Sequence, residues 1–483
     1  MMRTLFLQAP SFDGYDGGAG ARYQMKREVR SFWYPTWLAQ PAAMVEGSRL
    51  IDAPAHDQSW EDIAHEVDGK ELVILHTSTP SFNQDIRTAA LIKGRNPDAL
   101  IGFVGAKVAV EPDKSLAASP HIDFVAREEY DFTILEIAQG KPLAEVDGIT
   151  WRAPDGSFVR NKDRAIIENM DVLPMVSPVY KRDLTIEKYF GGYLRHPYVS
   201  FYTGRGCKSR CTFCLWPQTI SGHNYRFRSI PKVIEEVQYI LKEIPQTKEI
   251  FFDDDTLTDN HARVEDLARA LGALGFGKPG FKVSWSCNAK ANVPRKTLEV
   301  LKANGLRLLL VGYESGNQKI LHNIKKGLRV DVARQFTKDC HELGIVIHGT
   351  FILGLPGETK ETIEETIKFA TEINPHTIQV SLAAPYPGTF LYKQAMENRW
   401  LVDENMDLLT DRGTQVASLN YPHLSHTEIF QSVDDFYKRF YFRAPKIASI
   451  VGEMIMSPEM MKRRLREGLE FFRFLRERRE PAH

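Results

Sequence analysis

Long apolar runs, a charge excess and disulfide-forming cysteines are all missing from this sequence. No run reaches the ~18 apolar residues of a membrane-spanning helix, and the N-terminal run is too short for a signal peptide. The 62 Lys and Arg residues balance the 62 Asp and Glu residues, so no overall field favours nucleic acid. Only five cysteines occur in 483 residues, which agrees with a reducing compartment. These absences predict a cytoplasmic protein with no nucleic-acid partner.

Three of the five cysteines lie close together and predict a metal centre. Cys207, Cys211 and Cys214 have the spacing Cys-x3-Cys-x2-Cys. A structural zinc site needs four ligands, but the other two cysteines lie far downstream, and the nearest histidine, His223, has no partner at the usual spacing. Three thiolates on a four-iron cluster leave one iron open, as catalytic metals require. An iron-sulfur cluster with an open position is therefore favoured over zinc.

Residues 1–151 alternate short apolar runs with helical patterns. The expected buried strands are 5–7, 49–51, 71–75, 100–104 and 122–125, and the expected helices are 35–46, 60–67, 84–93 and 130–139. Strands separated by helices of this length predict a parallel, doubly wound, Rossmann-like sheet, whose ligands bind at the carboxyl ends of the strands. Prolines and glycines in residues 152–196 predict a linker.

Residues 197–390 show six further strand-helix units. The expected strands are 198–202, 249–252, 281–285, 307–311, 345–348 and 377–381, separated by amphipathic helices such as 231–243 and 359–371. This alternation predicts a partial (β/α)6 barrel with its chemistry at the carboxyl ends of the strands. Residues 391–483 form a helical C-terminal region, so the whole chain is predicted to be α/β.

Two groups of polar residues follow strands of the predicted barrel. Asp253, Asp254 and Asp255 follow the second strand, where clustered like charges are costly unless they are hydrogen-bonded or face a cation. Glu314 and Ser315 follow the fourth strand between glycines that permit close approach of the backbone to a ligand. A solvated acidic loop and a plain strand-to-helix turn are the alternatives.

The cysteine motif resembles the signature of the radical S-adenosylmethionine (radical SAM) superfamily. That signature is Cys-x3-Cys-x-aromatic-Cys, which Cys207, Cys211, Phe213 and Cys214 match. The resemblance implies a 4Fe-4S cluster on the three cysteines, S-adenosylmethionine (SAM) chelating the open iron, and a low-potential electron donor that drives cleavage to a 5'-deoxyadenosyl radical. It further implies SAM contacts from Phe213, Asp253, Asp254, Asp255, Glu314 and Ser315.

The loops after three N-terminal strands resemble those of the cobalamin-binding domain found in one radical SAM subfamily. The cobalamin contacts that this resemblance implies are Thr77, Ser78, Thr79, Gly105 and Glu128. The chain departs from the subfamily where Gly105-Ala106 replaces Gly-Gly and Glu128-Glu129 replaces Gly-Glu. Asp52 and His56 lack the Asp-x-His-x-x-Gly spacing, so no histidine of that loop is expected beneath cobalt. A Rossmann-like domain that has lost its cofactor is the alternative.

The C-terminal region is basic and rich in aromatic residues. Residues 436–483 carry twice as many basic as acidic side chains, interleaved with phenylalanine and tyrosine. Such an amphipathic helix can lie on an anionic bilayer, which predicts peripheral contact with the inner membrane. A solvated face over the open side of the barrel is the alternative.

Along nearly its whole length the chain resembles the hopanoid-biosynthesis-associated branch of these proteins, the bacteriohopanetetrol cyclitol ether synthase type. Residues 17–20, 30–41 and 379–389 carry the resemblance. It implies a hopanoid lipid substrate and ring contraction of its linked glucosamine to a cyclitol ether. Three rivals stay open: a cobalamin-dependent radical methyltransferase, an oxidative cyclase on another lipid or porphyrin-like substrate, and a non-catalytic cobalamin or redox sensor. Only the methyltransferase predicts S-adenosylhomocysteine beside 5'-deoxyadenosine.

Overall fold

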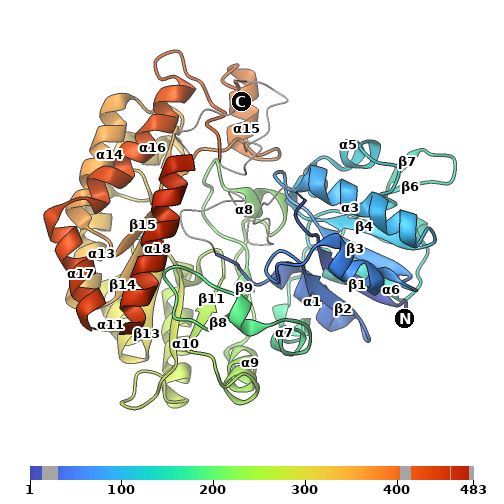
Figure 1. Cartoon of the computed structure of the whole chain (residues 1–483), viewed down its shortest axis with the longest axis horizontal. Coiled ribbons are helices and arrows are strands. Elements are labelled where there is room, and N and C mark those ends of the chain that lie inside the picture. The colour runs from blue at the N-terminus through green and yellow to red at the C-terminus, as the bar shows by residue number, and fades with distance from the viewer. Residues whose placement is uncertain (13–30, 403–414, 457, 478–483) are drawn as a thin grey trace.

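The computed structural model describes residues 1–12, 31–402, 415–456 and 458–477 of the 483. An N-terminal sheet domain lies beside a half-open barrel, and C-terminal helices cover the far side of the barrel (Figure 1). Residues 17–20, which carry part of the family resemblance, lie outside the described residues. The predicted α/β class and the order of its three parts are confirmed.

The N-terminal domain is a seven-stranded sheet with the order β2-β1-β3-β4-β5-β6-β7. Its first five strands are parallel, and β1 and β3 are buried along their whole length because helices cover both faces. The strands are β1 (Thr4–Gln8), β2 (Arg49–Asp52), β3 (Leu72–His76), β4 (Leu100–Val104), β5 (Phe124–Ala126), β6 (Ile149–Arg152) and β7 (Phe158–Arg160). The helices are α1 (Thr36–Met44), α2 (Trp60–Ile63), η1 (Ala64–Val67), α3 (Phe82–Arg95), α4 (Ala106–Val110), α5 (Pro112–Ala117), α6 (Asp131–Ala138) and η2 (Leu143–Glu145).

The sheet of this domain continues beyond the expected boundary at residue 151. Strands β6 and β7 form an antiparallel hairpin that extends the sheet to Arg160. Its turn contains Gly156 with φ 85°, a left-handed conformation suited to glycine. A three-residue edge strand is too short to show a periodic pattern, so the turn residues made the hairpin resemble a linker.

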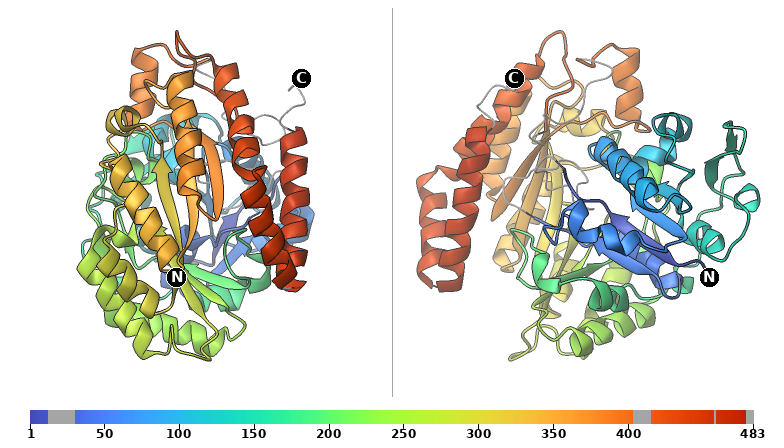
Figure 2. Two further views of the ribbon diagram at one scale, coloured as in Figure 1. Left: turned by 90° about the vertical axis from the view of Figure 1, so that its left-hand side faces the viewer. Right: turned by 45° about the vertical axis from the view of Figure 1, so that its right-hand side comes forward.

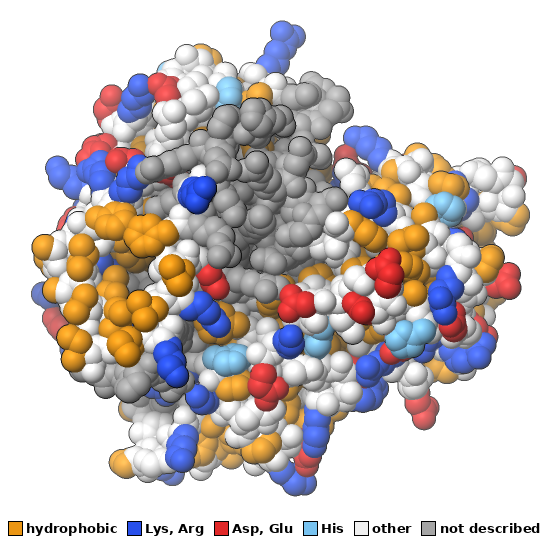
Figure 3. All heavy atoms as spheres, in the orientation of Figure 1, with side chains coloured by type: hydrophobic (Ala, Val, Ile, Leu, Met, Phe, Trp, Pro, Cys, Tyr) orange, Lys and Arg blue, Asp and Glu red, His pale blue; other side chains and the backbone are white. Residues whose placement is uncertain are grey.

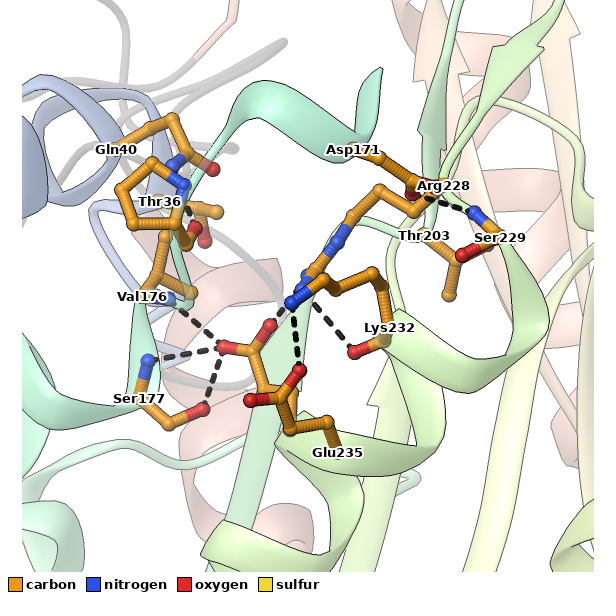
Figure 4. Close-up of polar contacts among 12 residues, drawn as sticks. Thr36, Gln40, Asp171, Val176, Ser177, Thr203, Arg228, Ser229, Lys232 and Glu235 are labelled. Carbon is orange, nitrogen blue, oxygen red and sulfur yellow. Dashed lines mark hydrogen bonds and ion pairs between the residues drawn. The ribbon is translucent and has the colours of Figure 1, made fainter. Parts of the chain in front are cut away.

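The segment from Asn161 to His196 connects the two domains and is held by buried polar contacts. It contains η3 (Met170–Val172), α7 (Ser177–Asp183) and η4 (Ile186–Lys188). Glu236 on the barrel accepts hydrogen bonds from the backbone of Val176 and Ser177, at 2.8 and 3.0 Å, and forms an ion pair with Arg228. Figure 4 shows these partners converging from both segments. The connection is therefore anchored to the barrel.

The barrel is a six-stranded parallel sheet with the order β15-β14-β13-β12-β11-β8. The predicted partial (β/α)6 barrel is confirmed, and helices cover its outer face (Figures 1 and 2). The strands are β8 (Tyr198–Phe201), β11 (Glu249–Phe252), β12 (Ser284–Ala289), β13 (Leu306–Glu314), β14 (Val346–Leu353) and β15 (Thr377–Leu382); a small hairpin of β9 (Gly204–Arg205) and β10 (Arg226–Phe227) follows β8. The helices are α8 (Leu215–Thr219), α9 (Ile230–Glu243), η5 (Leu257–Asp259), α10 (His261–Ala273), α11 (Arg295–Ala303), α12 (Gln318–Asn323), α13 (Val330–Glu342) and α14 (Lys360–Ile373).

Local sequence signals fix where several of these helices begin. Thr359 forms a capping box with Thr362 at the start of α14, and α9 carries a proline in its first turn. The third barrel strand begins three residues later than the sequence pattern predicts, because β12 starts at Ser284 and runs through Cys287 to Ala289.

The C-terminal region supplies α15 (Phe390–Glu397), α16 (His426–Tyr441), α17 (Ala444–Met456) and α18 (Pro458–Glu477). Helix α16 packs on β15 and α14, and α17 and α18 pack against each other as a hairpin outside it (Figure 2). No helix in the described part of the chain is both long and apolar enough to cross a membrane.

Buried ion pairs join the N-terminal domain to the barrel. Arg205 of β9 binds Asp131 of α6 at 2.6 Å, and Arg226 of β10 binds Glu129 at 2.8 Å. Beside them, Trp37 stacks on Trp216 with ring centroids 5.1 Å apart. Glu129 and Asp131 follow β5, so the carboxyl edge of the N-terminal sheet faces the cysteine loop. A buried charge that loses its partner costs several kcal/mol, which fixes this arrangement.

Candidate active site

The three cysteines line one pocket at the carboxyl ends of the barrel strands. Cys207, Cys211 and Cys214 lie between β9 and α8, and the pocket beside them has a volume of about 200 Å³. Cys207 and Cys211 are buried and Cys214 is half-buried, and all three are free thiols. The pocket also receives side chains from the ends of several other strands.

Polar side chains hold the backbone of the cysteine loop in place. The amide nitrogen of Gln218 donates to the carbonyls of Cys211, Thr212 and Cys214, at 3.2, 3.2 and 2.7 Å. Nδ1 of His223 lies 3.3 and 3.0 Å from the carbonyls of Cys207 and Ser209. His223 therefore supports the loop and is not placed as a fourth ligand.

Among the described residues, no three His, Cys, Asp or Glu side chains converge closely enough to hold one metal ion. In a four-iron cluster each thiolate binds a different iron, so its ligands stand further apart than those of zinc. Burial raises the pKa of Cys211 and of Cys214, whereas the positive charge of Lys326 opposes that increase.

A buried ion pair forms one wall of this pocket. Nζ of Lys326 lies 2.6 Å from Oε1 of Glu314, and both side chains line the pocket. Burial lowers the pKa of Lys326, but the attraction of Glu314 and Cys211 outweighs it and raises that pKa above its ordinary value. Lys326 thus remains a cation beside the thiols. Glu314 adopts φ 63°, which directs the chain sharply out of β13.

Of the predicted SAM contacts, the structure brings Phe213, Asp255 and Glu314 to the pocket. Asp254 instead accepts hydrogen bonds from Thr203 and from the Tyr225 hydroxyl, at 2.6 Å, in a fully buried network. Burial raises the pKa of Asp254, and Arg263 opposes that increase.

Two further predicted contacts also do not line the pocket. Asp253 accepts a hydrogen bond from Asn288 at 3.2 Å, and the Ser315 hydroxyl lies 3.0 Å from that of Thr366. The SAM contacts expected of Asp253, Asp254 and Ser315 stay a prediction, since these side chains contact other protein residues and lie outside the pocket lining. The periodic pattern located the strand ends but not which side of each turn faces the pocket.

Several pocket residues were missed by the sequence reasoning. The barrel residues among them lie on or directly after strands whose carboxyl ends form the pocket, which is the signal that could have found them. They are Asn288 and Ala289 at the end of β12, Lys290 directly after it, Thr350 and Ile352 on β14, Gln379 and Ser381 on β15, and Trp33, Tyr193 and Trp216 from outside the barrel strands.

The predicted cobalamin contacts gather at the carboxyl edge of the N-terminal sheet. Thr77 is buried, whereas Ser78, Thr79 and Glu128 are half-buried. Gly105 has φ 120°, and a Cβ there would lie 2.2 Å from the carbonyl oxygen of Thr77, so only glycine fits between β3 and β4. Thr77 and Gly105 therefore shape the edge, and the other three residues present polar atoms on it.

Known proteins resemble the chain both in sequence and in fold. Residues 201–370 match the Radical SAM superfamily. An uncharacterized methyltransferase of Pyrococcus horikoshii is 31% identical over 434 residues, which cover 88% of this chain and 91% of the relative. The anaerobic magnesium-protoporphyrin IX monomethyl ester cyclase of Rubrivivax gelatinosus is 26% identical over 81% of this chain and 70% of its own length.

Two solved structures share the whole arrangement of domains. The radical S-adenosylmethionine methyltransferase TsrM of Kitasatospora setae, with cobalamin and a [4Fe-4S] cluster bound, gives a TM-score of 0.66 at 16% identity and covers 92% of this chain and 83% of its own. The cobalamin-dependent radical enzyme OxsB, with aqua-cobalamin and S-adenosylmethionine bound, gives 0.69 at 14% identity and covers 98% and 72%.

The relative from Pyrococcus horikoshii extends along most of both chains, and the superfamily match includes the cysteine loop. Together with the thiol-lined pocket at the carboxyl ends of the barrel strands, these findings show that the chain belongs to the radical SAM superfamily and is an enzyme of that class, with a [4Fe-4S] cluster and S-adenosylmethionine as its cofactors.

Proposed function

We propose that this chain is a cobalamin-dependent radical SAM methyltransferase. One observation carries the proposal: the β9–β10 hairpin beside Cys207 is fixed by Arg205 and Arg226 to the carboxyl edge of the N-terminal sheet. A cofactor on that edge would therefore face the thiol-lined pocket. The name of the Pyrococcus relative, a methyltransferase, and the fold shared with two cobalamin-dependent enzymes support the same reaction class.

The comparisons do not support ring contraction of a hopanoid-linked glucosamine as the main function. The relatives reported above are named as methyltransferases or as a porphyrin cyclase, and neither name refers to a hopanoid. Oxidative cyclisation is the second candidate, because the Rubrivivax cyclase aligns with 81% of this chain.

The residues at the edge of the N-terminal sheet fit a bound cobalamin. Among the described residues, the buried Nε2 of His76 at the end of β3 has no hydrogen-bond partner, and such atoms are rare unless a ligand or water satisfies them. Burial lowers the pKa of His76 to about 4, so the ring is neutral. Ser78, Thr79 and Glu128 would hold the group from the same edge, and when bound it supplies a carrier for the methyl group.

In the pocket, the chain's own residues position charge and exclude water. Cys207, Cys211 and Cys214 would hold the cluster, which when bound supplies the electron that cleaves SAM. Asp255 and the Glu314–Lys326 pair offer both signs of charge in the pocket that the three cysteines line, and a methionyl ammonium and carboxylate would find partners there. The hydrophobic rings that line the pocket keep these interactions in a medium of low dielectric constant.

Product analysis after anaerobic reconstitution tests the proposal. The holoenzyme is incubated with SAM, cobalamin, a low-potential reductant and a candidate substrate. A methyltransferase is expected to release S-adenosylhomocysteine together with 5'-deoxyadenosine, and a Cys211→Ser variant is expected to release no 5'-deoxyadenosine. Release of 5'-deoxyadenosine alone would favour the cyclase, and release of neither product would support a sensor and refute both reactions.

A further inference from the structure

A second cavity lies beside the thiol-lined pocket and has no role in the proposed chemistry. Its volume is about 410 Å³, within the ~300–1,000 Å³ typical of small-molecule sites. It lies between β14, β15 and α16 on one side and the α17–α18 hairpin on the other. Its hydrophobic lining includes Ile378, Tyr437, Ile447, Ile450, Val451 and Phe472.

The two cavities share one continuous face of the barrel. Alternate residues of β15 point to the same side, so Thr377 and Gln379 line the new cavity while Gln379 and Ser381 line the thiol-lined pocket. Tyr193 also lines both cavities. Thr377 and Ser381 are four residues apart along the strand, or about 13 Å. One elongated molecule could therefore reach both cavities.

The charges in the described lining are already neutralised. Arg464 and Glu467 bind each other at 2.8 Å, and Arg464 also binds Glu453 at 2.6 Å. The ring of His348 stacks on Tyr193, and its Nδ1 lies 2.7 Å from the Thr377 hydroxyl. The cavity thus offers no net charge to an ionic ligand and favours an apolar one.

The mouth of the cavity continues into an exposed hydrophobic stripe. Ile447, Val451 and Phe472 line the cavity and are also 45%, 44% and 58% exposed. The stripe extends along both helices through Ile455, Met461, Leu465 and Leu469. Figure 3 shows these hydrophobic side chains gathered over α17 and α18. Exposed apolar surface of this extent marks an interaction site, and here it leads into the cavity.

We propose that this cavity binds the hydrocarbon portion of an amphiphilic substrate, whose reactive end extends along β15 to the thiol-lined pocket. The inference rests on the proposed function for the reaction at that end, but hydrocarbon binding itself needs no turnover. The stripe on α17 and α18 is the route by which the hydrocarbon reaches the cavity from a bilayer or a micelle.

Two matched glycines provide the test. Gly468 lines the cavity, Gly452 lies on α17 and does not, and a Cβ at either position would meet no atom within 4 Å. A side chain can therefore leave the backbone at both sites without a clash at its Cβ, and phenylalanine has a better helix propensity than glycine. Gly468→Phe fills the cavity, whereas Gly452→Phe adds the same side chain outside it.

The probe is dansyl-undecanoate, whose fluorescence rises on transfer to an apolar site. Wild type and Gly452→Phe are expected to bind it with equal Kd, and Gly468→Phe with a Kd raised at least about tenfold. Equal Kd values for all three proteins would overturn the proposal. Binding of free probe is compared with binding of probe dissolved in phosphatidylcholine vesicles. The comparison shows whether the cavity takes up the hydrocarbon from a bilayer or without one.

A second copy of the chain is the competing occupant of the stripe. If Leu469→Glu converted a dimer to a monomer in sedimentation velocity, and the dimer bound no probe, the stripe would be a subunit interface and the proposal would be wrong. Loss of methyl transfer alone would refute the proposed function and leave the binding result unchanged, because probe binding is measured on holoenzyme without SAM.

Discussion

At the scale of single residues, one buried ion pair forms a wall of the thiol-lined pocket. Lys326 is the partner of Glu314, and its positive charge opposes the increase in the pKa of Cys211 and of Cys214. Its side chain is 11% exposed and that of Glu314 is 8% exposed, so little solvent screens the pair. Replacing either residue alone leaves a buried charge without its partner.

We expect Lys326→Met to destabilise the protein by about 3–5 kcal/mol, the usual cost of breaking a buried pair. The double variant Lys326→Met/Glu314→Gln should recover most of this loss because no charge is left unpaired. Urea unfolding of the four proteins in the cycle measures the coupling. A double variant as unstable as the single one would show that the pair does not set the stability of the pocket.

Glu358, in the turn between β14 and α14, gives a pH-dependent stability. Burial raises its pKa to about 8, while hydrogen bonds from the backbone of Gly354 and Leu355 oppose the increase. A raised pKa means that the folded state binds the proton more tightly than the unfolded chain does. The stabilisation is complete below the unfolded pKa of ~4.3 and is lost as pH rises towards 8.

We therefore expect the contribution of Glu358 to lower stability as pH rises from 5 to 8, and Glu358→Gln to make the dependence of stability on pH less negative than in wild type, because glutamine resembles the protonated acid. Asp52 and Asp85, with pKa values of about 7 for the same reason, keep part of the slope. Tm measured across that range provides the check, with the solvent-exposed Glu361→Gln as control. An unchanged slope in Glu358→Gln would contradict the assignment.

At the scale of elements, α16 completes the open edge of the barrel. Alternate backbone N–H groups of β15 have no neighbouring strand to accept their hydrogen bonds, and side chains accept them instead. The N–H of Ile378 donates to the Tyr441 hydroxyl at 3.0 Å, and the N–H of Val380 donates to the Tyr437 hydroxyl at 2.8 Å. The side-chain oxygen of Gln415 accepts the hydrogen bond of the next such group, the N–H of Leu382. An edge strand with bare amides would pair with other chains, so this helix also protects against aggregation.

Tyr437→Phe is expected to destabilise the protein by about 1–3 kcal/mol, because it leaves the buried amide of Val380 without an acceptor. Tyr441→Phe should cost less, since the amide of Ile378 is only partly buried. Chemical denaturation compares the two variants. Equal losses would show that burial of the amide does not determine the cost.

Sequence patterns predicted the long periodic strands and helices well. They predicted short strands and the directions of side chains in turns poorly. Six barrel strands and the cysteine motif follow from periodicity and spacing, but β6 and β7 were missed because short antiparallel strands have no such signal. Among the strand-end acids, Asp255 faces the pocket and Asp254 faces Thr203, a difference set by the turn in three dimensions. Lys326 was missed because it lies outside any strand end.

At the scale of the whole molecule, buried ion pairs join the two domains. The Arg205–Asp131 pair is buried on both sides, and Arg205 also lies 4.6 Å from the ring centroid of Trp37. A domain joined only by a flexible linker would unfold by itself, whereas a large buried polar interface couples the two transitions.

We expect wild type to unfold in one calorimetric transition and Arg205→Met to unfold in two, with the N-terminal domain melting first. Arg205→Met/Asp131→Asn should restore part of the coupling, because it removes the unpaired carboxylate. Arg269→Met, which breaks an exposed pair with Glu265 on α10, is the control and should change Tm little. A single transition in Arg205→Met would contradict the inference.

The hairpin of β9 and β10 also limits how the molecule can open. Arg205 lies two residues before Cys207 and binds Asp131, and Arg226 on the paired strand binds Glu129. Both strands of the hairpin are therefore attached to the N-terminal domain. A hinge motion that separated the domains would move Cys207 away from Cys211 and Cys214 and would disrupt the cluster site. Substrates must therefore enter the pocket, and products leave it, without separation of the N-terminal domain from the barrel.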